Sequence, residues 1–254
     1  CRNLANESLQ MVYWHSLCGN LVEYNRAIFK YMNDRIPAFK ENARKLFGID
    51  GIYMTAGTTP GVSAPTKVVT VIIKWVGAAG WIAQHYYQYL LYTRDMEFAR
   101  DVMLPYMDGV AAFYEEFVQF TVDETGHERI RFYPSVSPEN TPGNFMPHES
   151  IQMDHPMPTT INSTIDLSII KEFFTNLLAV TKMCEDLPFA QERIDRWRRI
   201  LQSIPEFKKN DKGAVKEWQE DIFEDRYDHR HLSHIYPVFP GYELYPEKNP
   251  EKIE

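Results

Sequence analysis

The residues best suited to chemistry lie close together in the stretch 228–241, which reads Asp-His-Arg-His-Leu-Ser-His-Ile-Tyr-Pro-Val-Phe-Pro-Gly. His229, His231 and His234 fall within six residues, next to an aspartate and an arginine. The two prolines prevent this stretch from continuing as a helix, because proline fixes φ and lacks the N–H donor. Titratable groups on a stiff loop are typical of binding and catalytic sites. The sequence therefore predicts a polar site here.

Three kinds of site fit this histidine loop. His-x-His-x-x-His could bind zinc through three imidazoles and leave one coordination position open. Its spacing differs from the helical zinc signature, in which two histidines stand four residues apart with a glutamate between them. The cluster could also be a hydrogen-bonded structural element. The reading that we favour is an organic polar site that grips a hydroxylated ligand, with no bound metal.

Composition narrows the ligand class. The net charge of −8 and a pI near 5.5 argue against a nucleic-acid surface, which needs a basic patch. The longest apolar run, Val68 to Trp81, is interrupted by Lys74 and is shorter than the roughly 20 residues that span a bilayer, so no membrane helix is expected. Aromatic residues make up 14% of the chain and alternate with polar ones. This mixture suits carbohydrate, although a helical core also uses many aromatic residues.

The elements that must position these residues are predicted to be mostly helical. Three- and four-residue apolar spacing indicates amphipathic helices, a run that is apolar on all sides indicates a buried helix, and Asp-Glu-Thr-Gly indicates a hairpin turn. The predicted helices cover 17–32, 36–47, 68–92, 95–120 with a kink at Pro105, 163–180 and 189–203, and one more begins at Asn249; the predicted strands are a hairpin over 121–132 and short strands over 204–218.

Long loops follow alternate helices in this pattern, so they should gather at one end of a helical bundle or toroid. Asn6, Glu139, His155 and the histidine loop all lie on such loops. Glu139 follows a proline in a Ser/Pro/Asn segment where no amphipathic face explains a carboxylate, although a surface loop acid is an equal reading. One end of the molecule is therefore predicted to collect the chemistry.

Several motifs, in order along nearly the whole chain, resemble the catalytic domain of glycoside hydrolase family 95, the inverting α-L-fucosidases. The two most specific are Ser-Pro-Glu-Asn at 137–140 and His-Arg-His-Leu-Ser-His at 229–234. The others are Gln10-Met11 with Tyr13-Trp14, Gly80-Trp81-Ile82-Ala83-Gln84-His85 with Tyr92-Thr93 and Asp95, Thr164-Ile165-Asp166, and Pro240-Gly241. The resemblance implies an all-α fold, an (α/α)6 barrel or six-hairpin toroid, with a small β-hairpin insertion.

The resemblance also implies roles for individual residues. Glu139 would be the general acid that protonates the leaving oxygen, because it matches the glutamate of Ser-Pro-Glu-Asn. In the family, two asparagines polarised by an aspartate position the attacking water; Asn6 matches the first, and Ser8 replaces the second. The polarising aspartate is expected beyond Glu254, and Asp228 is a local candidate.

The remaining matched residues would bind the sugar. His229, His231 and His234 would form the floor of the site, and Asn140 would lie beside the acid. Trp81 and His85 would line the pocket, although core packing explains Trp81 equally well. Asp154 and His155 match no role in the family.

We expect residues 1–254 to form a single glycosidase-like domain that is truncated at both ends, because too few helices are predicted to close a toroid. Its partners would be a glycan substrate and the missing parts of the same parent chain, and an isolated piece should associate through exposed apolar flanks and show weak or no turnover. No cofactor is implied, and the family setting suggests an extracellular or periplasmic location. Three alternatives stay open: another sugar such as α-L-galactose, a sugar-binding homologue that has lost catalysis through Ser8, and a metal-dependent hydrolase.

Overall fold

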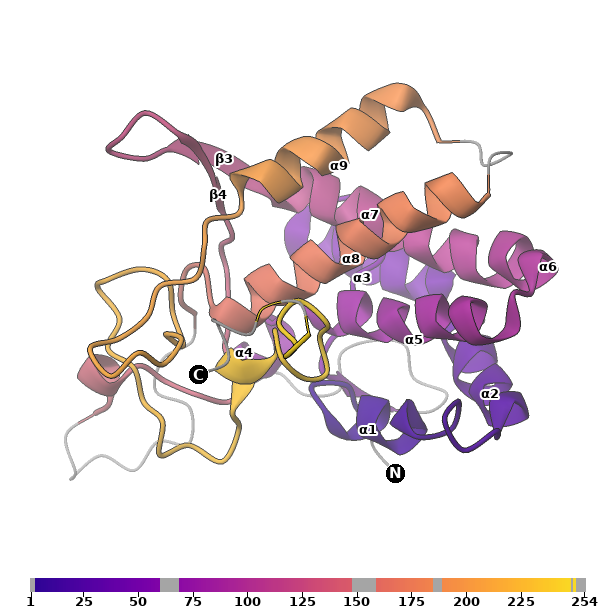
Figure 1. Cartoon of the computed structure of the whole chain (residues 1–254), viewed down its shortest axis with the longest axis horizontal. Coiled ribbons are helices and arrows are strands. Elements are labelled where there is room, and N and C mark those ends of the chain that lie inside the picture. The colour runs from indigo at the N-terminus through magenta and orange to yellow at the C-terminus, as the bar shows by residue number, and fades with distance from the viewer. Residues whose placement is uncertain (1–2, 60–68, 148–158, 185–188, 248, 250–254) are drawn as a thin grey trace.

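The computed structural model describes residues 3–59, 69–147, 159–184, 189–247 and 249 (Figure 1). The described chain is mostly helical, with two small two-stranded antiparallel sheets. The helices are α1 (Ser8–Trp14), α2 (Val22–Asn33), α3 (Ile36–Phe47), α4 (Thr70–Ile73), α5 (Ala78–Thr93), α6 (Met96–Phe98), α7 (Leu104–Phe117), α8 (Thr164–Met183) and α9 (Gln191–Ser203). The strands are β1 (Asn3–Leu4) with β2 (Gly57–Thr58), and β3 (Gln119–Val122) with β4 (Glu128–Arg131).

Helix α5 lies at the centre of the packing and contacts α1, α2, α7 and α8. Twelve of its sixteen residues are buried, which agrees with the prediction of a helix that is apolar on all sides. Gly80 permits a close approach, because a Cβ there would lie 2.5 Å from the Tyr114 hydroxyl and 2.8 Å from Ile169. The small residues of α5 thus let α7 and α8 pack tightly against it.

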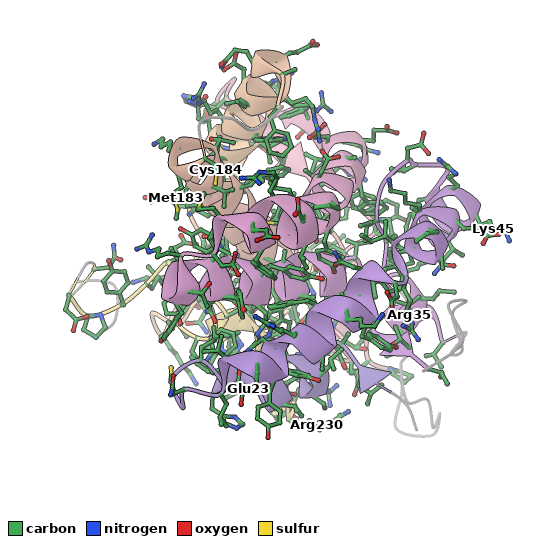
Figure 2. The ribbon with its side chains drawn as sticks, turned by 90° about the vertical axis from the view of Figure 1, so that its right-hand side faces the viewer. Glu23, Arg35, Lys45, Met183, Cys184 and Arg230 are labelled. Carbon is green, nitrogen blue, oxygen red and sulfur yellow. The ribbon has the colours of Figure 1, made fainter. Side chains whose placement is uncertain are left out.

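Helices α2 and α3 cover one side of this core and show the predicted amphipathic pattern. Phe29 and Phe39 are buried, whereas Glu23 and Lys45 project from the outer surface (Figure 2). Helix α3 ends at Gly48, which adopts φ +70°, as the sequence predicted. The predicted helix over 17–32 was wrong in its first turns, because the chain makes a tight turn near Asn20 (φ 56°) before α2 begins at Val22.

The predicted continuous helix over 68–92 was also wrong. Helix α4 ends at Ile73 and α5 begins at Ala78, with an extended break between them. In this break Lys74 is exposed, while the indole of Trp75 is buried and donates a hydrogen bond of 2.8 Å to Asp166. A regular helix could not serve both side chains, so the need to solvate a charge and satisfy a buried carboxyl interrupts it.

The segment after α5 agrees with its prediction in outline. Asp95 caps the next helix by accepting a hydrogen bond of 2.9 Å from the N–H of Phe98. Residues Ala99–Met103 form a π-helical turn just before Pro105, where the sequence predicted a kink. The hairpin is confirmed as β3 and β4, with Gln119 opposite Arg131. Within 204–218, by contrast, the strand prediction is reduced to two isolated bridges, Lys209 with Val215 and Trp218 with Ser163.

The described segments between β4 and α8 and after α9 lie largely at the left of Figure 1, where α8 starts at Thr164. Asn249 is described, but the helix predicted to follow it lies outside the described residues, as do Asp154 and His155. Within the part of the chain that is described, no helix has the length and apolar character needed to cross a bilayer.

Gly51 should be essential for this packing. Its φ of +132° is a conformation that side chains rarely adopt, and a Cβ there would lie 2.4 Å from the backbone nitrogen of Phe113. We expect Gly51→Ala to destabilise the fold by about 3 kcal/mol or more, and each kcal/mol lowers Tm by roughly 2–4 °C in a chain of this size. Thermal unfolding followed by circular dichroism measures the change.

Gly126→Ala is the matched control, because Gly126 also has positive φ (+83°) but no atom lies within 4 Å of the position that a Cβ would take there. It should cost only about 1–2 kcal/mol, the conformational part alone. Equal losses in the two variants would show that the contact with α7 is unimportant.

Candidate active site

The loop that carries Glu139 is anchored to the start of α8. The backbone of Ser135 exchanges hydrogen bonds of 3.0 and 2.7 Å with Thr160. The hydroxyl of Ser135 and the N–H of Val136 donate bonds of 2.7 and 3.1 Å to Asp166, on the first turn of α8. Asp166 is 1% exposed, and burial raises its pKa to about 6 despite these bonds and the one from Trp75. A buried carboxyl on a helix thus fixes the loop four residues before the predicted acid.

Glu139 is the point where three distant segments meet. Its carboxylate accepts a hydrogen bond of 3.3 Å from the Asn6 amide, pairs with Arg230, and lies 3.4 Å from Nε2 of His231. The side chain is 14% exposed. Its backbone has φ +61°, a conformation that costs about 1–3 kcal/mol and persists only where the surroundings enforce it. Such a strained residue in a polar cluster is typical of a functional site.

The histidine loop supplies neutral imidazoles. The rings of His229 and His231 stack at 5.2 Å between centroids, and Nδ1 of His231 lies 3.2 Å from the Glu7 carboxylate. The pKa of each histidine is lowered, above all by burial; at His231 the charge of Arg230 lowers it further, whereas Glu7 and Glu217 raise it. Nε2 of His231 has no hydrogen-bond partner among the described residues, although Glu139 is near it. A neutral ring protonated at Nδ1 would therefore present an acceptor toward Glu139.

His234 points to a different carboxylate. Its Nδ1 lies 2.7 Å from Glu217, which is 1% exposed, and its ring packs against Tyr227 at 4.7 Å. The same carboxylate also accepts a hydrogen bond from Ser137. His231 thus faces Glu7 and Glu139, whereas His234 contacts Glu217 and serves an internal contact.

A cavity of about 250 Å³ adjoins this cluster. Its aromatic and apolar wall includes Met11, Trp81, Ile165, Tyr236 and Phe239, and its polar residues are Asn6, Glu7, Arg230, His231 and Ser233. Trp81 is 4% exposed, and its indole N–H has no partner among the described residues. The volume is slightly below the roughly 300–1,000 Å³ of usual ligand pockets, which suits a single small ring.

The other predicted residues lie around this centre without reaching the cavity. His85 is 1% exposed and packs edge-on against Trp14 at 5.5 Å, and burial lowers its pKa to about 4. Asn140 is 3% exposed; its amide donates to the carbonyl of Arg226 (3.1 Å) and accepts from the N–H of Thr141 (2.9 Å). Both are therefore held inside the protein in this structure.

The two remaining predicted catalytic residues are solvent-exposed. Ser8 is exposed at the first position of α1. The side chain of Asp228 is 79% exposed and pairs with Arg226 at 3.1 Å. Neither contacts Glu139 among the interactions of the described residues. Glu7 and Glu217 contact the histidines instead, although the sequence analysis gave neither of them a role. Only two features of the sequence could have pointed to them: Glu7 is next to Asn6, and Glu217 lies near the end of the predicted strand segment 204–218.

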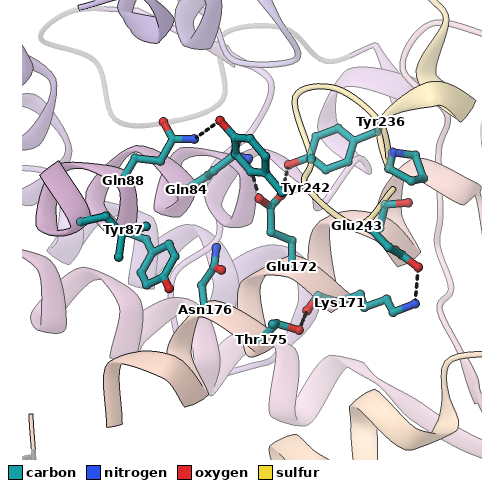
Figure 3. A pocket seen from close by; sticks show the side chains of 14 residues that line it. Gln84, Tyr87, Gln88, Lys171, Glu172, Thr175, Asn176, Tyr236, Tyr242 and Glu243 are labelled. Carbon is teal, nitrogen blue, oxygen red and sulfur yellow. Dashed lines mark hydrogen bonds and ion pairs between the residues drawn. The ribbon is translucent and has the colours of Figure 1, made fainter. Parts of the chain in front are cut away.

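A second cavity, of about 310 Å³, lies between α5, α8 and the segment 236–243 (Figure 3). Glu172 accepts hydrogen bonds from Gln84 (2.5 Å) and from the hydroxyl of Tyr236 (2.8 Å), and burial raises its pKa to about 7. Tyr236 lines both cavities, so this network supports the wall of the first one from behind. None of the predicted catalytic residues lines the second cavity.

Metal chemistry has no geometric support in the described residues. They contain no group of three or more histidine, cysteine, aspartate or glutamate side chains arranged to hold an ion. His231 and His234 turn instead to Glu7 and Glu217.

Comparison with known families identifies the family of this chain. The profile of the glycosyl hydrolase family 95 catalytic domain matches residues 1–254. The chain belongs to glycosyl hydrolase family 95. The resemblance drawn from the motifs is thereby confirmed.

Two curated relatives are distant members of the same lineage. Alpha-L-fucosidase 2 from Arabidopsis thaliana is 26% identical over 247 residues, which are 97% of this chain and 28% of the relative. Probable alpha-fucosidase A from Aspergillus niger is 25% identical over 244 residues, or 94% of this chain and 28% of the relative. This family 95 chain therefore spans about 28% of the length of these relatives.

A solved structure supports the fold. A putative kojibiose phosphorylase from the human microbiome superimposes with a TM-score of 0.54 at 12% sequence identity, covering 74% of this chain and 26% of that one. With the family match, this likeness implies that the helices form part of an (α/α)6 toroid. The fold class predicted from the motifs is thus confirmed at this level.

Asp166 should make the stability of this family 95 chain depend on pH. Its folded pKa of about 6 lies above the ordinary 3.8, so its contribution is present below pH 3.8 and is lost as the pH rises through 6. This difference corresponds to roughly 3 kcal/mol. Relative to Asp166→Asn, which does not titrate, the wild type should lose about that much free energy of unfolding between pH 4 and 7, as measured by urea denaturation.

Asp123→Asn is the control, because a hydrogen bond from Thr125 and others lower the pKa of Asp123 to about 2. Its difference from wild type should stay nearly constant above pH 4.5. A wild-type advantage that grows with pH at position 166 would instead show that the three hydrogen bonds outweigh burial.

Proposed function

We propose that this chain carries the acid of an inverting glycoside hydrolase that acts on a terminal α-L-fucoside, and that Glu139 is that acid. The observation that carries the proposal is the convergence of Asn6, Arg230 and His231 on the Glu139 carboxylate. These three partners, though not Glu139 itself, line a small aromatic-walled cavity. The names of the two relatives, both fucosidases, support the choice of sugar. The activity belongs to the whole protein, with the rest of the parent chain as partner.

The surroundings of Glu139 act on its proton in opposite directions. A general acid must hold its proton near neutral pH, and a nearby cation favours the ionised form instead. Arg230 is that cation, but its side chain is 66% exposed and can move into solvent. The neutral His231 ring offers an acceptor at 3.4 Å, which favours a protonated Glu139. We propose that an incoming sugar displaces Arg230, so that the Glu139 carboxyl stays in contact with His231 and keeps its proton.

The water side of the reaction must form when the sugar binds. Inverting enzymes separate the two reacting groups by about 6.5–9.5 Å to admit a water molecule. Asn6 lies 3.3 Å from Glu139 in this structure, too close for a sugar to fit between them. Asn6 would hold the attacking water once a sugar has separated the two groups. Ser8 and Asp228, both exposed, would join it only after a similar rearrangement.

The replacement of the second family asparagine by Ser8 favours one second candidate, a homologue that binds sugar without cleaving it. In the family two asparagines polarised by an aspartate position the water, and a serine cannot reproduce the role of the amide. Such a protein would keep the cavity and its affinity but lose turnover. A related sugar such as α-L-galactose is the nearest alternative within catalysis.

Kinetics of the complete gene product distinguish these possibilities. Glu139→Gln keeps the shape of the side chain and removes its proton, so kcat on an aryl α-L-fucoside with a poor leaving group should fall by about 10²–10⁴-fold. Ser8→Asn should raise kcat if the amide improves the water site. Assays on α-L-fucosides and α-L-galactosides, with NMR of the first-formed anomer, give specificity and stereochemistry.

Glu124→Gln, at the exposed tip of the hairpin, is the matched control and should retain full activity. Full activity in Glu139→Gln would remove the acid from this position. Sugar binding without turnover in wild type would instead establish the binding homologue, and loss of activity on adding a chelator would revive the metal reading.

A further inference from the structure

We infer that Glu217 is a positioning residue for the proposed reaction, and that it locks the loop of the acid to the loop of the histidines. The inference rests on the proposed function, because it assigns a role in the same site. No motif of the family resemblance includes Glu217, and its segment, 204–218, was predicted only as short strands.

The Glu217 carboxylate joins the two loops directly. One oxygen accepts a hydrogen bond from the hydroxyl of Ser137, two residues before Glu139. The other lies 2.7 Å from Nδ1 of His234, three residues after His231. The residue is 1% exposed, so both contacts form out of water, where a hydrogen bond to a charged group is worth more than at the surface.

The backbone of Glu217 is fixed as firmly as its side chain. Its N–H donates to Asp225 at 2.8 Å, and its carbonyl accepts from the N–H of Thr164 at 3.0 Å. Thr164 is the first residue of α8, the helix that also carries Asp166. Together Asp166 and Glu217 accept hydrogen bonds from three consecutive residues, 135–137. The segment just before Glu139 is therefore fixed against the start of α8.

Glu217 also acts through its charge. It raises the pKa of His229 and of His231, against the dominant effect of burial. The other groups that face this pair of loops are Asp225 and Tyr227 beside Glu217, Arg226 near His229, and Arg230 and Glu7 around Glu139 and His231. A negative charge near an imidazole favours its protonated form. Removing the charge should therefore lower the pKa of His229 and of His231 further.

Two variants of the complete gene product separate position from charge. Glu217→Gln removes the charge and one acceptor. Ser137→Ala removes only the hydrogen bond between Glu217 and the loop that carries Glu139. Both should lower kcat on an aryl α-L-fucoside by about 10–100-fold with little change in KM, because small misplacements of a reacting group have effects of this size. Only Glu217→Gln should also lower the pKa of His229 and of His231, as measured by an NMR pH titration.

Glu224→Gln is the matched control, since Glu224 is an exposed acid on the same segment. It should leave kcat and the histidine pKa values unchanged. A merely structural Glu217 would instead lower Tm while kcat per folded molecule and the pKa values of His229 and His231 stay at wild-type values, and that result overturns the inference. If Glu217→Gln does not fold, an unchanged kcat in Ser137→Ala overturns it just as well.

NMR keeps the inference separate from the proposed function. If wild type hydrolyses no glycoside, the proposed function fails, but ¹⁵N shifts of His234 still test the lock. Wild type should show a single tautomer protonated at Nδ1, because a carboxylate can only accept. Glu217→Gln should show a mixture of tautomers, and an unchanged His234 signal would overturn the inference on its own.

Discussion

The structure depends on the requirement that buried carboxyl groups be hydrogen-bonded. Asp166, on the first turn of α8, and Glu217, which packs against the first residue of α8, are each 1% exposed. Together they accept bonds from three different segments of the chain. An isolated carboxylate could not stay buried there, because the loss of hydration would cost several kcal/mol. The loops therefore have to adopt the conformations that supply the donors. The two buried carboxyl groups, each of which is costly to desolvate, thereby give the irregular loops a defined conformation.

This constraint explains why the chemistry gathers where it does. The start of a long helix leaves N–H groups without intrahelical partners, and the loops that enclose it bring their own polar groups. In this chain those loops are the one that carries Ser135 to Glu139 and the histidine loop, 228–241, and they meet at Glu139. The apolar helices α5 and α7 pack behind α8 and supply a rigid support, as sites on loops require. The apolar core and the polar site thus differ in composition, and they meet at the start of α8.

The sequence predicted the regular part of this arrangement well. Periodicity located α3, α5, α7, α8 and α9, and turn chemistry located the hairpin, because these signals are local. It failed at 74–77, where Lys74 needs solvent and Trp75 needs Asp166, since that partner lies 91 positions further along the chain. The family resemblance pointed to Glu139 and Asn6, and the structure brings the two into contact. Glu7 and Glu217 were missed because long-range hydrogen bonds leave no pattern in the sequence.

The same separation of core and site bears on the substitution at Ser8. A serine at the exposed start of α1 disturbs no packing and breaks no described hydrogen bond, so folding does not select against it. Under the proposed function, its effect would fall on the water that an inverting enzyme must hold, because the second asparagine of the family pair would stand at this position. The acid side of the proposed site is held by the fold through Asp166 on α8, whereas the contact of Asn6 with Glu139 would have to open to form the water side. Position 8 would then be determined by catalysis rather than by stability.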